Sequence, residues 1–145
     1  MVLLTLLIEH TLFGIGPDGY TIVTVLLHIV NTVFVVTLFS MLAKCQSVGW
    51  ATAAFFAIHP VQLESVTWVS SIKGLVVGAF ILAHLNCVMR EERTPKQERW
   101  GLVFFTFAIL SKALTVVVPA IVVLYDMLVC RKKFSDALTR QFIPG

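Results

Sequence analysis

Long apolar runs separated by short polar stretches dominate this chain. Residues 20–43 form a mainly apolar run of 24 residues, long enough to cross a hydrocarbon core of about 30 Å as one helix. Two shorter apolar runs, residues 48–59 and 74–89, flank a more polar stretch. Residues 100–130 form a run of 31 residues, which as one helix would measure about 46 Å. Because this length exceeds the hydrocarbon thickness, we expect a helical hairpin of two short or re-entrant segments.

The remaining segments predict the boundaries of the membrane domain. Residues 1–13 are apolar but would reach only about 20 Å as a helix, and they lack the positive start and cleavage site of a signal peptide. We therefore expect residues 1–19 to form an interfacial helix and a turn. The polar segments are predicted to be an outer-face loop or short helix at residues 60–73, a cytoplasmic loop at 90–99 and a cytoplasmic tail at 131–145.

Composition agrees with this pattern. Hydrophobic residues make up 58% of the chain and charged residues 13%, whereas an average soluble domain has roughly 45–50% and 25%. We therefore expect one all-α domain over residues 1–145. It is predicted to be a polytopic membrane helix bundle with about four to five membrane segments.

The placement of the basic residues predicts which loops face the cytoplasm. Under the positive-inside rule, clusters of lysine and arginine mark cytoplasmic loops. Three such clusters require the chain to cross the membrane and return between each pair, so an integral, multi-pass membrane protein is predicted. The three cysteines, Cys45, Cys87 and Cys130, lie close to these clusters and are expected to be unpaired thiols on the reducing side. The clusters are Lys44; Arg90, Arg93, Lys96 and Arg99; and Arg131, Lys132, Lys133 and Arg140.

Four ionisable residues are predicted to meet at the outer face. His59, Glu64 and Lys73 lie in or beside the polar stretch, and Lys112 lies where the 100–130 hairpin is expected to turn, near Ser111. Ionisable groups in or beside lipid are costly and indicate a functional site. Two lysines suit a phosphate as point charges, so the cluster would fit a ligand with an anionic head and a lipid tail. Taken singly, each residue has a structural alternative, such as a snorkelling lysine or a satisfied loop carboxylate.

Other polar residues have structural interpretations. Thr21, Thr24, His28 and Asn31 share one helical face, and we expect this bundle polar face to form hydrogen bonds between helices. Gly74 and Gly78 form a GxxxG pair, a pattern that permits close helix packing but is weak as a single match. His84 and Cys87 are too few ligands for a metal, so no metal site is predicted and His84 is expected to be packed and hydrogen-bonded.

The sequence contains no phosphate-binding loop, no nucleophile elbow, no CxxC pair and no basic-aromatic surface for nucleic acid. The stretches FFAIHPVQLESVTWVSSIK and LSKALTVVVPAIVVLYD instead resemble the membrane part of GT-C-type glycosyltransferases that carry tetratricopeptide repeats. These are the transmembrane O-mannosyltransferases of eukaryotes and their bacterial relatives. The family pattern, HPxHxExVxWxSxRKD and then LSKPxxVxxPxxLLLxD, is matched at His59, Pro60, Glu64, Val66, Trp68, Ser70, Lys73, Leu110, Ser111, Lys112, Val116, Pro119 and Asp126.

The resemblance extends upstream. LFGIGPDGYTIVTVLLH is similar to the family's LFGLxPxGYHxxNxLLH, so the likeness covers residues from about 12 to 126. It implies transfer of a sugar such as mannose from a polyprenyl-phosphate donor to a serine or threonine of an acceptor protein. The reaction would take place on the luminal face of the endoplasmic reticulum or the periplasmic face of a bacterial inner membrane. Lys112 and Lys73 would bind the lipid phosphate, and Glu64 and His59 would line the sugar site.

The departures from the pattern keep other functions open. The family's second histidine is Gln62 here, its arginine is Ile72, the aspartate after its lysine is Gly74, and the His and Asn of its first span are Thr21 and Thr24. The acidic catalytic residues of the family are expected in an upstream outer loop that this sequence lacks. We therefore expect an internal or truncated membrane portion that is inactive alone, with its catalytic residues unknown. The alternatives are a non-catalytic membrane scaffold or assembly subunit, and a transporter segment.

Overall fold

The computed structural model describes residues 17–60, 72–90 and 94–128. All regular structure within these ranges is helical, which confirms the predicted all-α class for this part of the chain. The helices are α2 (Pro17–Ala43), α3 (Gln46–Ile58), α5 (Ile72–Val88), α6 (Pro95–Ser111), the 3₁₀ helix η2 (Ala113–Val117) and α7 (Val118–Leu128).

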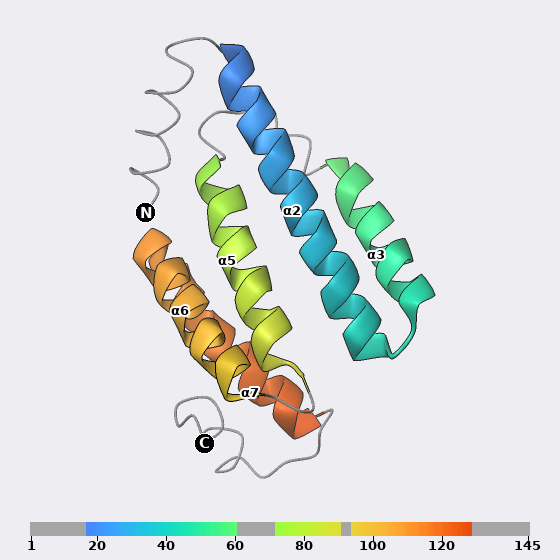
Figure 1. The fold of residues 1–145 in the computed structure, drawn as a ribbon, viewed down its shortest axis with the longest axis vertical. Coiled ribbons are helices and arrows are strands. Elements are labelled where there is room, and N and C mark those ends of the chain that lie inside the picture. Colours follow the sequence, from blue (N-terminus) through green and yellow to red (C-terminus); the bar gives the residue numbers. More distant parts are fainter. Residues whose placement is uncertain (1–16, 61–71, 91–93, 129–145) are drawn as a thin grey trace.

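Successive helices alternate in direction. Figure 1 shows α2 running down, α3 up, α5 down, α6 up and α7 down again. We call the end where α2 and α5 begin the upper end, and the opposite end the lower end. α2 packs between α3 and α5, and α5 packs against α6 and also touches α7. The chain therefore passes through this body five times within the described residues, but only α2 meets the length and hydropathy expected of a membrane span.

A tight turn joins α2 to α3 at the lower end. Lys44 adopts a left-handed backbone conformation with φ 52°. Its N–H donates to the Met41 carbonyl at 3.3 Å, and the Cys45 N–H donates to the Ser40 carbonyl at 3.2 Å. These two bonds form the Schellman motif that ends many helices, usually with glycine in the left-handed position. α3 therefore begins at once and runs back along α2.

The closest helix approach occurs between α3 and α2. Gly49 and Ala53, four residues apart, are the buried residues of α3. A Cβ added at Gly49 would overlap Ser40 Oγ and lie 2.7 Å from the Val36 carbonyl oxygen. By contrast, a Cβ added at Gly74 would have no described atom within 4 Å. The GxxxG pair noted in the sequence is thus not the site of close packing, which lies at Gly49 instead.

Polar side chains tie α2 to α5. The Thr37 hydroxyl donates to Asn86 Oδ1 at 2.8 Å, and Asn86 Nδ2 donates to the Phe34 carbonyl at 3.0 Å. Asn31 Nδ2 donates to the Leu75 carbonyl at 3.1 Å. Such bonds between helices contribute roughly 0.6 kcal/mol each on average in membrane proteins. The two asparagines therefore fix the rotation of α2 relative to α5.

An apolar cluster joins three helices. Leu38 of α2 and Val122 of α7 are buried together with Met89, which directly follows α5. Half-buried side chains pack around them, namely Met41, Leu42, Leu82, Leu85 and Tyr125. This cluster is where α7 packs against the rest of the bundle.

α6 begins earlier than the apolar pattern predicts. The sequence placed residues 90–99 in a loop, but α6 starts at Pro95. The reason is a capping box: the Thr94 hydroxyl accepts from the Gln97 N–H at 3.4 Å, and the Gln97 side chain accepts from the Thr94 N–H at 3.0 Å. Pro95 occupies the first helical position, which suits proline because no N–H is needed there. The first turn of α6 is therefore a polar extension of an apolar helix.

Candidate functional site at the upper end

Lys112 lies at a break between two helices. α6 ends at Ser111, Lys112 has an extended backbone with φ −157° and ψ 126°, and η2 begins at Ala113. The Lys112 N–H still donates to the Ala108 carbonyl at 3.0 Å, so α6 is hydrogen-bonded to its last turn. The Lys112 side chain is exposed. The break between α6 and η2 thus falls next to Ser111, near which the turn was expected.

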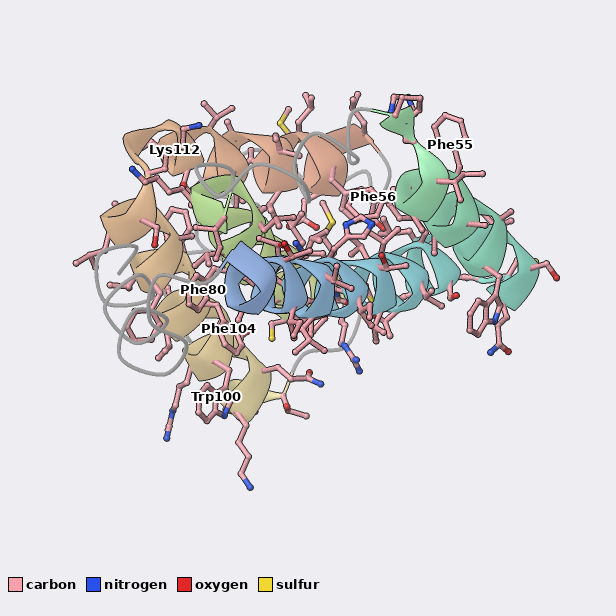
Figure 2. All side chains as sticks on the ribbon, turned by 90° about the horizontal axis from the view of Figure 1, so that it is seen from above. Phe55, Phe56, Phe80, Trp100, Phe104 and Lys112 are labelled. Carbon is pink, nitrogen blue, oxygen red and sulfur yellow. The ribbon has the colours of Figure 1, made fainter. Side chains whose placement is uncertain are left out.

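Lys73 lies on a neighbouring helix end. It belongs to the first turn of α5 and is exposed. α5 packs antiparallel against α6, with Phe80 on Phe107 and His84 on Gly101, so Lys73 and Lys112 lie at the same end of this helix pair. In Figure 1 the upper end of α5 extends above that of α6, and Figure 2 labels Lys112 at the junction of α6 and η2. The upper end of the α5–α6 pair, here called the corner, therefore carries two exposed cations, and positive charge of this kind favours an anionic group such as a phosphate.

His59 lies elsewhere on the upper end. It caps α3 with an extended backbone, as expected for a residue before proline. Its ring packs edge-on against Phe55, with the ring centroids 5.1 Å apart. In Figure 2, Phe55 and Lys112 lie on opposite sides of the molecule. The structure therefore brings Lys73 and Lys112 to one corner but does not bring His59 to it, and Glu64 lies outside the described residues.

Two departures from the family pattern have a structural counterpart. Ile72, at the arginine position of the pattern, is fully buried with 0% exposure. Its neighbour Gly74, at the aspartate position, is exposed. The corner therefore carries the two lysines without the arginine and the aspartate of the pattern, so its charge within the described residues is positive.

His28 and Asn31 contact different neighbours of α2. His28 Nε2 lies 3.4 Å from the Ala57 carbonyl oxygen, and its ring stacks on Phe56 with the centroids 5.5 Å apart. Asn31, only 2% exposed, bonds to α5 through Leu75. One polar face of α2 thus contacts both α3 and α5. Thr24, on the same predicted face, instead donates its hydroxyl within α2, to the Thr21 carbonyl at 2.9 Å.

His84 is packed and hydrogen-bonded, as expected. Its Nδ1 lies 2.8 Å from the Gly101 carbonyl oxygen, and its ring lies 5.1 Å from that of Phe105. Among the described residues, no group of three potential ligands could hold a metal ion. Through this hydrogen bond and ring contact, His84 joins α5 to α6.

An apolar hollow of about 410 Å³ lies along the upper half of α2. The described residues that line it are Thr21, Ile22, Val25 and Leu26. A surface of this kind suits hydrocarbon and not a charged head group.

Apolar sequence patterns did not identify the residues that shape the upper end and the α2–α5 contact. Thr115 is 2% exposed and its hydroxyl lies at the break beside Lys112. Asn86 bridges α2 and α5 from within an apolar run. The T-P-x-Q spacing of residues 94–97 is a readable signal for the start of α6, whereas Thr115 carries no comparable signal in the sequence.

Comparison of this chain with family models, with curated proteins and with solved structures finds no match.

Proposed function

We propose that this chain is part of the membrane domain of a glycosyltransferase that uses a polyprenyl-phosphate sugar donor, and that its upper end binds the lipid phosphate. The observation that carries the proposal is the pair of exposed lysines, Lys73 and Lys112, on adjacent helix ends, with Lys112 at a helix break. The resemblance of the surrounding stretches to the GT-C-type family supplies the substrate class.

The apolar surface of the bundle supports a membrane location. The window Thr21–Ala43 has a mean hydropathy of 2.4, yet only 22% of it is buried. The core helix of a soluble protein would be mostly buried, so this exposed apolar surface needs another apolar environment. Lipid would supply it. The shorter helices α3, α5 and α7 would cross only with local thinning of the bilayer.

The proposed topology is multi-pass, with the upper end luminal or periplasmic. The described basic residues Lys44, Arg90, Lys96 and Arg99 lie on the segments that meet at the lower end, which is the expected cytoplasmic side. The host membrane would be the endoplasmic reticulum in a eukaryote or the inner membrane in a bacterium.

Thiol labelling tests this topology. Cys45 is exposed in the turn between α2 and α3, whereas Cys87 is partly covered by its neighbours. With Cys130 replaced by serine, a membrane-impermeant maleimide should label Cys45 from the cytoplasmic side only, and faster than Cys87 because reactivity follows exposure. Sealed right-side-out and inverted vesicles provide the two measurements. Labelling of Cys45 from the outer side would exclude the proposed topology.

The proposed chemistry places the lysines on the leaving group. The acceptor hydroxyl attacks the anomeric carbon of the sugar, the bond from that carbon to the phosphate oxygen breaks, and the lipid phosphate departs with the added negative charge. Lys112 and Lys73 would stabilise that charge as preorganised cations. The proton of the hydroxyl passes to a general base, which none of the described residues supplies convincingly. Acceptor protein and lipid-linked sugar are thus the proposed partners.

A non-catalytic scaffold is the second candidate. The observation in its favour is that three polar residues of the bundle, Asn31, Asn86 and His84, form hydrogen bonds between helices. Such residues would serve assembly without any chemistry at the upper end.

Substitution of Lys112 separates the two candidates. For the chain reconstituted in lipid nanodiscs, Lys112→Gln should weaken binding of a labelled polyprenyl phosphate by about tenfold or more, because a charged hydrogen bond contributes roughly 1.5–3 kcal/mol. Lys96→Gln is the matched control: it removes the same charge from the exposed opposite end of α6. Equal binding by both variants and the wild type would refute the phosphate site. A loss of thermal stability in Lys112→Gln without a change in binding would favour the scaffold.

A further inference from the structure

The helix break at Lys112 occurs without a residue that usually breaks helices. Residues 107–117 contain neither glycine nor proline. Leucine, lysine and alanine, which surround the break, are all strong helix formers. Pro119, in the first turn of α7, disfavours an unbroken helix at residues 115–118 but lies seven residues beyond Lys112, so another interaction is needed to end α6 at Ser111.

Thr115 supplies that interaction. Its hydroxyl lies 2.7 Å from the Lys112 carbonyl oxygen and 3.2 Å from the Ala108 carbonyl oxygen. Its backbone N–H also donates to the Lys112 carbonyl, at 3.1 Å. The Ala108 carbonyl, in the last turn of α6, also accepts from the Lys112 N–H at 3.0 Å, so each carbonyl has a backbone donor and the hydroxyl adds a second one. On one continuous helix residues 108 and 115 would be about 10 Å apart along the axis, so the contact between the Thr115 hydroxyl and the Ala108 carbonyl exists only when the chain folds back.

The Thr115 hydroxyl lies in a buried environment, which strengthens its hydrogen bonds. Thr115 is 2% exposed and Ala108 is 0% exposed, so water has little access to the carbonyls that the hydroxyl reaches. A hydrogen bond in such a place is electrostatically stronger than one exposed to water. The buried hydroxyl thus favours the folded-back chain over a continuous helix through Lys112.

We propose that Thr115 is a positioning residue for Lys112: its buried hydroxyl ends α6 and holds the Lys112 backbone extended, so that the lysine side chain projects at the upper end. The phosphate-binding consequence rests on the proposed function. The effect of Thr115 on the helix break itself does not depend on the proposed function.

A geometric rescue distinguishes positioning from a general packing defect. Thr115→Val keeps the shape of the side chain and removes the hydroxyl. A proline at position 113 imposes the same break by another route, because it pushes the preceding residue to extended geometry and suits the first turn of a helix. Lys112 already has that geometry, with φ −157° and ψ 126°. Ala113→Pro should therefore restore the break in the Thr115→Val background.

The first readout reports the break directly. Spin labels at positions 103 and 124, on exposed residues Val103 and Leu124, would lie about 31 Å apart on one continuous helix. In the native chain α6 and α7 both point back to the lower end from Lys112, so the distance should be well below that value (Figure 1). The labelled chain carries serine at its three cysteines.

In Thr115→Val, the distance distribution should broaden towards about 31 Å, and polyprenyl-phosphate binding should weaken by about three- to tenfold, as expected for one hydrogen bond. Thr115→Ser and the Thr115→Val, Ala113→Pro double variant should match the wild type in both readouts. The control is Thr106→Val, whose hydroxyl donates to the Leu102 carbonyl within the same helix at 2.9 Å. It should change neither readout.

The outcomes separate this inference from the proposed function. A wild-type distance distribution in Thr115→Val overturns the positioning role, as does an equal change in Thr106→Val. A failure of Ala113→Pro to restore the distance also overturns it. A changed distance in Thr115→Val, together with no phosphate binding by the wild type, supports the role of Thr115 in the break and overturns the proposed function.

Discussion

Gly49→Ala is expected to destabilise the bundle by about 3 kcal/mol, in the upper range for forced overpacking. The added Cβ would overlap Ser40 Oγ and would lie 2.7 Å from the Val36 carbonyl oxygen and 2.9 Å from the Ser40 backbone nitrogen. The last two are backbone atoms of α2 and cannot rotate away. The helices α2 and α3 must therefore separate, which removes packing along their whole contact.

The effect can be measured by unfolding the chain in mixed detergent micelles, followed by circular dichroism. Gly74→Ala is the matched control, since its added Cβ meets no described atom within 4 Å. It should be neutral or slightly stabilising, because alanine is favoured over glycine by up to about 1 kcal/mol inside helices. Ser40→Ala combined with Gly49→Ala should give only partial recovery, since the two backbone contacts remain. A Gly49→Ala variant as stable as Gly74→Ala would contradict the close approach of α2 and α3.

These glycines also show why helix contacts were not predictable here. In the sequence, Gly74 and Gly78 have the familiar GxxxG spacing, whereas Gly49 is paired with Ala53 in a less conspicuous pattern. The structure buries Gly49 and exposes Gly74. Whether a small residue meets another helix depends on which face of its helix turns inward. A single sequence does not show which helix packs against that face.

The helices themselves were easier to predict than their ends. The apolar run at residues 20–43 lies within α2, and the run at residues 100–130, too long for one span, is divided at Lys112 between α6 and η2. Helix ends depend on single polar side chains. Thr94 caps the start of α6 within a segment that its low hydropathy predicts to be a loop. The turn at Lys112 involves the hydroxyl of Thr115, a single group that an apolar pattern does not predict.

The sequence predicted at which end of the bundle the candidate site residues lie, because that depends only on the direction of each helix. Alternating passes bring His59, Lys73 and Lys112 to the same end of the bundle, because each lies at or next to a helix end on that side. Lateral position is different, since it depends on the order in which helices pack. α3 packs on the far side of α2 from α5, so His59 is separated from the corner formed by Lys73 and Lys112.

Leu38→Ala is expected to destabilise the bundle by about 2–3 kcal/mol, the lower part of the range for buried leucines. Leu38 is 4% exposed and packs with Met89 and Val122 where three segments of the chain meet. Removal of its side chain leaves a cavity that loses dispersion contacts with all three, and packing of this kind is a main force between helices in lipid. Denaturation in mixed micelles gives the free-energy change.

Leu124→Ala is the matched control, and it tests what covers the outer face of α7. Leu124 lies on α7 and is 55% exposed. If lipid covers this surface, the side chain contacts hydrocarbon in both the folded and the dissociated state, so its truncation should change stability by less than about 0.5 kcal/mol. A loss equal to that of Leu38→Ala would mean that protein covers the outer face of α7. The difference between the two leucines therefore measures whether protein covers the exposed apolar surface of α7.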